Sequence, residues 1–157
     1  MPRFHGASEK SRWAPLPIRL AIGYGFMAHG WAKLSRGPAG FAALIRHIGL
    51  PLPTFTAWAT TLLELLGGLA ILAGAFVTVV GAPLIVTMLV AMSKVHLRYG
   101  FSSIKTIGLG PDGPLFGPPG YEVNLLYVAG LLSLILAGAG AFSLDGWLAR
   151  RRDHADR

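Results

Sequence analysis

The chain has 157 residues, of which 53% are hydrophobic and only 13% are charged. Soluble domains carry about 25% charged residues, so this composition excludes most soluble classes and is typical of an integral membrane protein. The chain contains no cysteine, which excludes disulfides, thiolate catalysis and iron–sulfur ligation by its own thiols. The net charge of +7 invites a nucleic-acid function, but the basic residues lie mostly in tails and connections, so we expect no nucleic-acid partner.

Residues 1–15 are polar and predict a short cytoplasmic arm, and no cleavable signal peptide is evident before the first apolar segment. Four apolar segments approach the roughly 20 residues that a helix needs to cross a bilayer. They cover residues 16–34, 54–74, 76–97 and 123–142. We therefore predict an all-α membrane protein, a four-transmembrane-helix bundle over residues 16–148, followed by a basic cytoplasmic tail at 149–157.

Two connections between these segments have distinctive patterns. After the first segment, Phe41, Leu44, Ile45 and Ile48 follow helical spacing, which predicts an amphipathic helix on the membrane surface. Before the fourth, residues 99–122 form a long Gly- and Pro-rich loop that stays apolar. Loops of this length are usually functional or disordered, and the apolar residues argue against disorder. We expect a lid over the outer mouth of the bundle; the alternative is a loop that only lies at the membrane surface.

The distribution of Lys and Arg predicts the orientation. With an even number of spans both termini share one side, and eight of the fourteen basic residues fall there. Cytoplasmic segments are enriched in Lys and Arg, which favours both termini in the cytoplasm of a bacterial inner membrane. The terminal side holds Arg3, Lys10, Arg12, Arg19, Arg150, Arg151, Arg152 and Arg157.

Glu64 is the most informative residue, because no other charge occurs between Thr54 and Val80. An acid at the centre of the hydrocarbon costs about 2.5–3.5 kcal/mol on insertion scales, so it must be neutralised, paired or near water. Candidate partners lie on two other apolar segments: His29 and Lys33 on the first, Lys94 and His96 on the third.

These polar residues are predicted to converge at mid-membrane and in the outer half of the bundle. Such a pocket suits a lipophilic, protonatable molecule, and a quinone is the natural candidate, bound without covalent attachment. Glu64, His29 and Lys33 are the candidate catalytic residues, with Glu64 exchanging protons. The residues predicted to complete the binding site are His96, Lys94, Glu122, Tyr121 and Asn124. The alternative is that Glu64 only links two helices by hydrogen bonds. Such interhelical contacts average about 0.6 kcal/mol, which hardly offsets the free-energy cost of inserting an acid into the membrane.

Met88, Met92 and His96 are spaced four residues apart, a donor set that would suit Cu(I). Methionine more often simply fills a membrane core, so we predict no metal site. Asp145 and Arg150 are predicted to form a helix cap and a cytoplasmic anchor at the end of the last span.

The order of these features resembles the DoxX family of small four-span bacterial membrane proteins. The resemblance covers most of residues 16–148 and rests on Arg19, Gly23, the run Gly30-Trp31-Ala32-Lys33-Leu34, Phe41, Gly49-Leu50-Pro51, Glu64-Leu65-Leu66-Gly67-Gly68-Leu69, Gly120-Tyr121-Glu122 and residues 138–145. It implies a four-helix bundle linked to redox metabolism, with relatives that include a subunit of thiosulfate:quinone oxidoreductase. It also implies that the family's Lys and two Glu positions correspond to Lys33, Glu64 and Glu122.

Three functions remain open from the sequence. The first is a quinone- or lipid-binding subunit of a membrane redox system that acts with a partner enzyme. The second is a non-catalytic scaffold, or a transporter of a small solute, whose exposed loops control function. The third is a copper-handling protein that uses Met88, Met92, His96 and His29. In each case we expect contact with membrane lipids and either a protein partner or a homo-oligomer.

Overall fold

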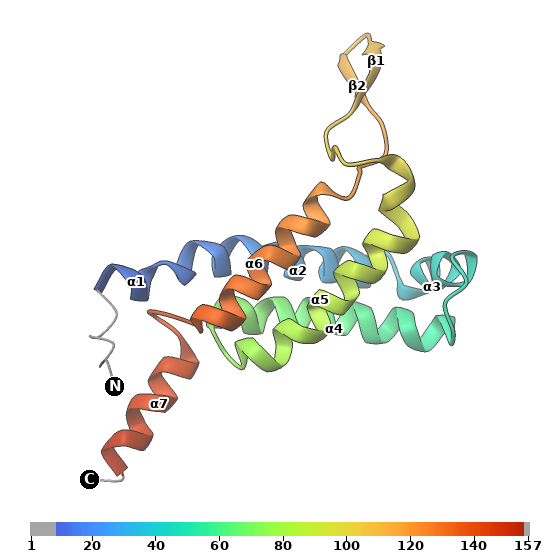
Figure 1. Ribbon diagram of the computed structural model, residues 1–157. Coiled ribbons are helices and arrows are strands. Elements are labelled where there is room, and N and C mark those ends of the chain that lie inside the picture. Colours follow the sequence, from blue (N-terminus) through green and yellow to red (C-terminus); the bar gives the residue numbers. More distant parts are fainter. Residues whose placement is uncertain (1–8, 156–157) are drawn as a thin grey trace.

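The computed structural model describes residues 9–155, and most of these residues are helical (Figure 1). The first eight residues of the predicted N-terminal arm and the last two of the predicted tail lie outside the described residues. In chain order the elements are α1 (Glu9–Trp13), α2 (Pro15–Ser35), α3 (Pro38–His47), α4 (Pro53–Ala73), α5 (Val77–Ala91), the π-helix η1 (Met92–His96), the 3₁₀-helix η2 (Leu97–Tyr99), β1 (Thr106–Gly110), β2 (Gly113–Phe116), α6 (Glu122–Ala137) and α7 (Leu144–Ala155).

The first two long helices begin and end within one residue of the predicted segments. α2, α3 and α4 each have proline in the first turn, where the missing N–H costs no hydrogen bond. α4 ends at Gly74, which adopts a left-handed conformation with φ of 64°. Glycine takes this conformation without steric cost, which makes it a common helix stop.

The third and fourth helices differ from the prediction. α5 loses regular α-helical form at Ala91 and continues through η1 and η2 to Tyr99. α6 ends at Ala137, five residues before the predicted end, because Gly138 and Gly140 have positive φ angles of 78° and 70°. The chain then loops into α7, a helix that contains most of the predicted basic tail.

The four long helices pack in a ring. α2 contacts α4 and α6, and α5 also contacts α4 and α6. Figure 1 shows α2 and α4 side by side, with α5 and α6 crossing them obliquely. The core between them is apolar and is formed mainly by Ile22, Phe26, Ile71, Val77, Leu84, Leu131 and Leu134.

Glycine lets α2 and α4 approach closely. A Cβ atom on Gly23 would lie 2.7 Å from the backbone nitrogen of Leu72, a separation that real Cβ atoms do not show. On Gly30 it would overlap the backbone of Leu65, and on Gly68 it would overlap that of Met27. Small residues at such contacts are characteristic of helix packing in membranes, where backbones gain close van der Waals contact.

Two helical stretches are long and apolar enough to cross a bilayer, Pro53–Ala73 and Val77–Tyr99. Only 33% and 17% of their most apolar windows are buried inside the chain, so most of their apolar side chains face outward. On α4 the outward residues form one helical stripe: Phe55, Trp58, Leu62, Leu66 and Leu69. An apolar stripe of this extent needs apolar surroundings, such as lipid or another helix.

The amphipathic helix predicted after the first span is present as α3. It packs on α4, where Ala42 and Ile45 are buried together with Ala57. Phe41 and Ile48 pack at the edge of this cluster, whereas Leu44 is 39% exposed. The buried face is therefore rotated slightly from the predicted stripe, toward the side that meets α4.

The long loop contains an antiparallel hairpin, β1–β2, whereas the sequence predicts no strand in this region. We expected this loop to cover the outer mouth of the bundle, but Figure 1 shows the hairpin projecting away from the helices. Its apolar side chains are accordingly exposed: Ile107 by 64%, Leu109 by 82% and Phe116 by 61%.

Arg19 joins three segments at the opposite end of the bundle. Its side chain is 2% exposed and donates five hydrogen bonds, all to backbone carbonyl oxygens. Two acceptors, Ile71 and Leu72, lie in the last turn of α4, where carbonyl oxygens lack the i+4 N–H partner of an α-helix. The other three acceptors are in the α6–α7 loop: Ala139, Ala141 and Phe142. One guanidinium therefore holds α2, α4 and this loop together.

We predict that Arg19→Ala lowers the free energy of unfolding by at least about 3 kcal/mol, since hydrogen bonds to charged groups contribute about 1.5–3 kcal/mol each. Unfolding in mixed detergent micelles, followed by circular dichroism, measures this loss. The exposed Arg36→Ala variant should change stability by less than about 0.5 kcal/mol. Equal stability of the two variants would contradict the role of Arg19.

A second prediction concerns the contact between α2 and α4. Gly30→Ala should destabilise the protein, because the added methyl group overlaps the backbone of Leu65. Gly40→Ala is the matched control, since a Cβ at Gly40 in α3 meets no atom within 4 Å and alanine favours helix by about 1 kcal/mol. In the same measurement, the free energy of unfolding of Gly30→Ala should be lower than that of the unmodified protein. That of Gly40→Ala should be equal or higher.

Candidate functional site

Glu64 lies on the inner face of α4 and is 2% exposed. The buried residues of α4 recur at helical spacing: Ala57, Thr61, Glu64, Gly67, Gly68 and Ile71. The hydroxyl of Thr61 donates to the Ala57 carbonyl oxygen at 2.7 Å, so its hydrogen is committed to the helix backbone. The carboxyl group of Glu64 is thus the one acidic function on an otherwise apolar and small-residue face.

Lys33 of α2 forms an ion pair and a hydrogen bond with the Oε2 atom of Glu64. Of the two side chains, that of Glu64 is 3% exposed and that of Lys33 is 23% exposed. The ammonium also lies 4.4 Å from the ring centroid of Phe41, a cation–π contact made from α3. The pair therefore brings together α2, α3 and α4, with the lysine side open to the surroundings.

The local sequence explains why these two residues meet. Gly30 lies against the backbone of Leu65, the residue after Glu64. Lys33 follows Gly30 by about one helical turn, on the same face of α2. The close helix contact at Gly30 therefore places the lysine within reach of the acid, and a larger residue at position 30 would separate them.

His29 does not join this pair. It is exposed on α2, and among the described residues it forms no hydrogen bond or ion pair. Ile22 and Phe26, which precede His29 by about two turns and one turn of α2, do face the core. His29 itself is exposed, and Lys33 reaches the interior through its long side chain.

Three of the predicted binding residues instead anchor the long loop. His96 places its Nδ1 atom 3.0 Å from the Pro119 carbonyl oxygen. The Oε2 atom of Glu122 accepts a hydrogen bond from the backbone N–H of Ser103 at 3.0 Å. Tyr121 packs edge-to-face on Phe101, with ring centroids 5.5 Å apart. These contacts fasten both ends of the loop to η1 and α6.

Asn124 and Lys94 occupy two further environments. Asn124 is buried and its amide lies 3.5 Å from the Met88 carbonyl oxygen and 3.8 Å from the Met88 sulfur, which links α6 to α5. Lys94 is exposed in the π-helix η1. The eight predicted residues therefore separate into one ion pair, a set of loop anchors, one interhelical contact and two exposed side chains, those of His29 and Lys94.

The π-helix η1 alters the predicted spacing of Met88, Met92 and His96. Met92 and His96 are the first and last residues of η1, so their four-residue spacing is not that of an α-helix. The Nδ1 atom of His96 is engaged by Pro119, and Met88 is in contact with Asn124. Within residues 9–155 no group of three His, Cys, Asp or Glu side chains could hold a metal ion.

Asp145 caps a helix other than its own. Its carboxylate accepts hydrogen bonds from the backbone N–H groups of Phe76 and Val77, at 2.8 and 3.2 Å, where α5 begins. The sequence predicts Asp145 as a cap at the end of the last span, whereas the helix it caps is α5. The sequence does not predict that Asp145 caps α5, because the left-handed conformation of Phe76 at the start of α5 is unusual for a phenylalanine.

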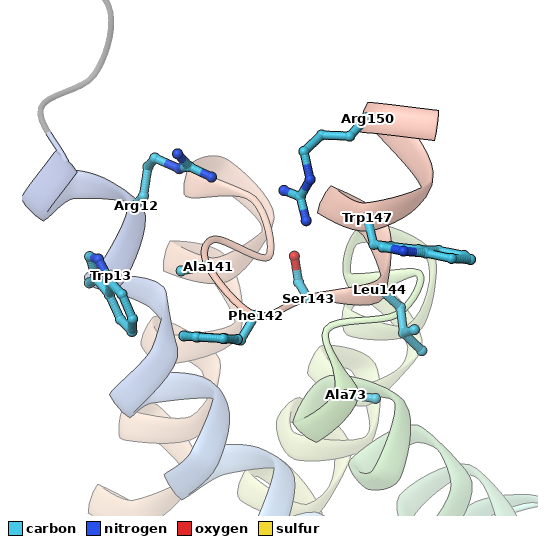
Figure 2. Close-up of a pocket in the computed structure, with 9 residues that line it drawn as sticks. All are labelled: Arg12, Trp13, Ala73, Ala141, Phe142, Ser143, Leu144, Trp147 and Arg150. Carbon is cyan, nitrogen blue, oxygen red and sulfur yellow. The ribbon is translucent and has the colours of Figure 1, made fainter. Parts of the chain in front are cut away.

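The structure has two further cavities, and neither is lined by the ion pair. One, of about 360 Å³, lies between α3 and the start of α4 and is lined in part by Ala42, Arg46 and Trp58. The other, of about 630 Å³, lies at the end that carries α1 and α7 (Figure 2). Lys33 and Glu64 line neither of them.

Comparison with known proteins places this arrangement in a family. Residues 14–97, more than half of the chain, match the DoxX family, and this region contains Arg19, Lys33 and Glu64. An uncharacterized membrane protein of Mycobacterium tuberculosis (strain ATCC 25618 / H37Rv) is 30% identical over 139 residues, which cover 85% of this chain and 80% of that protein. No solved structure matches the chain significantly. The chain therefore belongs to the DoxX family and is a membrane protein with helical spans.

Proposed function

We propose that the protein crosses the bacterial cytoplasmic membrane four times, through α2, α4, the continuous stretch from α5 to η2, and α6, with both termini in the cytoplasm. The excess of Lys and Arg at the terminal end supports this orientation. α6 has 16 residues and spans about 24 Å at 1.5 Å per residue. A helix this short crosses where the bilayer thins locally or its flanking residues reach the interface.

We further propose that the protein is a quinone-binding subunit of a membrane redox system, with Lys33 and Glu64 at the binding site. The single observation that carries this proposal is the Lys33–Glu64 pair, a charged pair that joins two apolar helices. Intramembrane ion pairs commonly mark proton or substrate sites, because their cost is otherwise hard to offset.

The residues at the pair suit a quinone headgroup. Lys33 is partly open and carries donor hydrogens that a carbonyl oxygen can accept, while the Phe41 ring gives an apolar surface beside it. Glu64 lies behind the lysine and can take or release a proton through it. A bound quinone would supply the capacity to accept two electrons and two protons; the electrons would come from a partner protein, because the chain has no cysteine for a cluster of its own.

We predict that Glu64→Gln loses most of the quinone that copurifies with the unmodified protein, because glutamine keeps the shape of the acid but carries no charge to pair with the ammonium of Lys33 and no proton to exchange. Mass spectrometry of small molecules extracted after mild purification measures the bound quinone. Lys33→Gln should have the same effect.

Glu122→Gln is the matched control for this measurement. Glu122 is also a partly buried acid, but its partner is the backbone N–H of Ser103 in the loop. Its substitution should leave the bound quinone within about twofold of the unmodified level. Full quinone retention in Glu64→Gln and Lys33→Gln, with the fold intact by circular dichroism, would refute the proposed site.

A second candidate function, a scaffold that docks a partner enzyme, is favoured by the exposed hairpin. Ile107, Leu109 and Phe116 present apolar side chains on a projection that contacts no other part of the described chain extensively. Exposed apolar surface of this kind often marks a protein contact.

For the scaffold we predict that the triple substitution Ile107→Ser, Leu109→Ser and Phe116→Ser abolishes copurification of partner proteins without changing the bound quinone. Affinity purification from the native membrane, analysed by mass spectrometry, measures both. If the triple variant keeps its partners while Glu64→Gln loses them, the hairpin is not the docking element.

A further inference from the structure

The pocket at the terminal end of the bundle is built differently from the ion-pair site. It has a volume of about 630 Å³ and lies between α1, the α6–α7 loop and α7, at the end of the molecule remote from the hairpin (Figures 1 and 2). Volumes of 300–1,000 Å³ are usual for small-molecule sites. Neither the proposed quinone site nor the proposed scaffold function uses this pocket.

Two arginines face one another across it. Figure 2 shows Arg12 extending from the N-terminal side and Arg150 from α7, toward the space above Ser143. Among the side chains that the structure describes, residues 11–151, no Asp or Glu lines the pocket and neither guanidinium has an acidic partner. Two like charges directed into one space favour an anion between them, and the guanidinium fork matches the oxygen atoms of a phosphate.

Most acceptors in the α6–α7 loop beneath the two arginines already have hydrogen-bond donors of their own. The carbonyl oxygens of Ala139, Ala141 and Phe142 are occupied by Arg19. The hydroxyl of Ser143 donates to the Gly140 carbonyl oxygen and accepts from the N–H of Gly146. Among the side chains that the structure describes, Arg12 and Arg150 therefore have few acceptors near them, and their donor hydrogens are available to a ligand.

The walls of the pocket are aromatic and already held in place. Trp13 packs edge-to-face on Phe142, with ring centroids 5.2 Å apart. The ring of Trp147 is covered by the guanidinium of Arg151 at 3.9 Å from its centroid. Tryptophan concentrates at the membrane–water interface, where one end of the ring is apolar and the other meets water. Two tryptophans beside the pocket thus place it at headgroup depth.

We propose that this pocket binds the phosphate group of an anionic phospholipid in the leaflet that faces the two termini. Basic pockets between helices at the cytoplasmic side are suited to anionic headgroups. The apolar part of the lining, which includes Phe142 and Leu144, suits the adjoining acyl region and distinguishes a lipid from free phosphate. The bound lipid would bridge α1 and α7 and hold the two terminal helices together.

The test is native mass spectrometry of the delipidated full-length protein, titrated with phosphatidylglycerol, phosphatidylcholine or inorganic phosphate. The double variant Arg12→Gln/Arg150→Gln removes both facing charges. Arg36→Gln/Arg98→Gln removes the same charge from exposed positions near the ends of α2 and η2, at the other end of the bundle. Circular dichroism establishes that each variant is folded.

We expect the unmodified protein to bind phosphatidylglycerol at least about tenfold more tightly than phosphatidylcholine. The Arg12/Arg150 variant should lose about tenfold or more of that affinity, since each cation near a lipid surface contributes about 1 kcal/mol and 1.4 kcal/mol is tenfold. The control variant should stay within about threefold. Equal affinity for the two lipids, or equal loss in both variants, would overturn the proposal. Displacement of phosphatidylglycerol by millimolar inorganic phosphate would identify a free-phosphate site and overturn the lipid assignment.

Discussion

The close contact between α2 and α4 is the constraint on which the rest of the structure depends. Gly23, Gly30 and Gly68 remove the side chains that would hold the two backbones apart. At one end of this contact Lys33 reaches Glu64, and at the other Arg19 reaches the last carbonyls of α4. Both interactions bury charge, and buried charge is tolerated only with a partner at hydrogen-bond distance. By allowing the two helices to approach, the glycines bring each charged group within hydrogen-bond distance of its partner. These charged interactions in turn fix how α2 and α4 pack.

The two charged interactions have different chemical capacities. Arg19 is fully enclosed and all of its acceptors are backbone oxygens, so it has no capacity left for a ligand. Lys33 remains 23% exposed and has an acid on one side and an aromatic ring on another, so part of its ammonium group is open to a ligand. This difference separates a residue that organises the fold from a pair suited to chemistry. It also explains why the proposed function rests on Lys33 and Glu64 alone among the buried charges.

Hydrophobic pattern and turn residues were sufficient to predict α2, α4 and the helix α3. An acid in an apolar segment needs a partner, and the sequence offers four candidates for Glu64 without deciding that Lys33 is the one. The positions of His29 and of the loop anchors could not be predicted, because helical periodicity does not specify which neighbour a face meets. His29 lies about one helical turn after the buried Phe26 yet is exposed. The role of Arg19 could not be predicted either, because all of its partners are backbone carbonyl oxygens, which every residue type has. The π-helix η1 and the early end of α6 had only weak local signals.

The proposal that the Lys33–Glu64 pair exchanges protons with a bound quinone can be tested by infrared difference spectroscopy, which compares the quinone-loaded protein in its oxidised and reduced states. We predict a change in carboxyl protonation upon reduction that disappears in Glu64→Gln and persists in Glu122→Gln. A difference spectrum that is the same in the unmodified protein and in Glu64→Gln would contradict it.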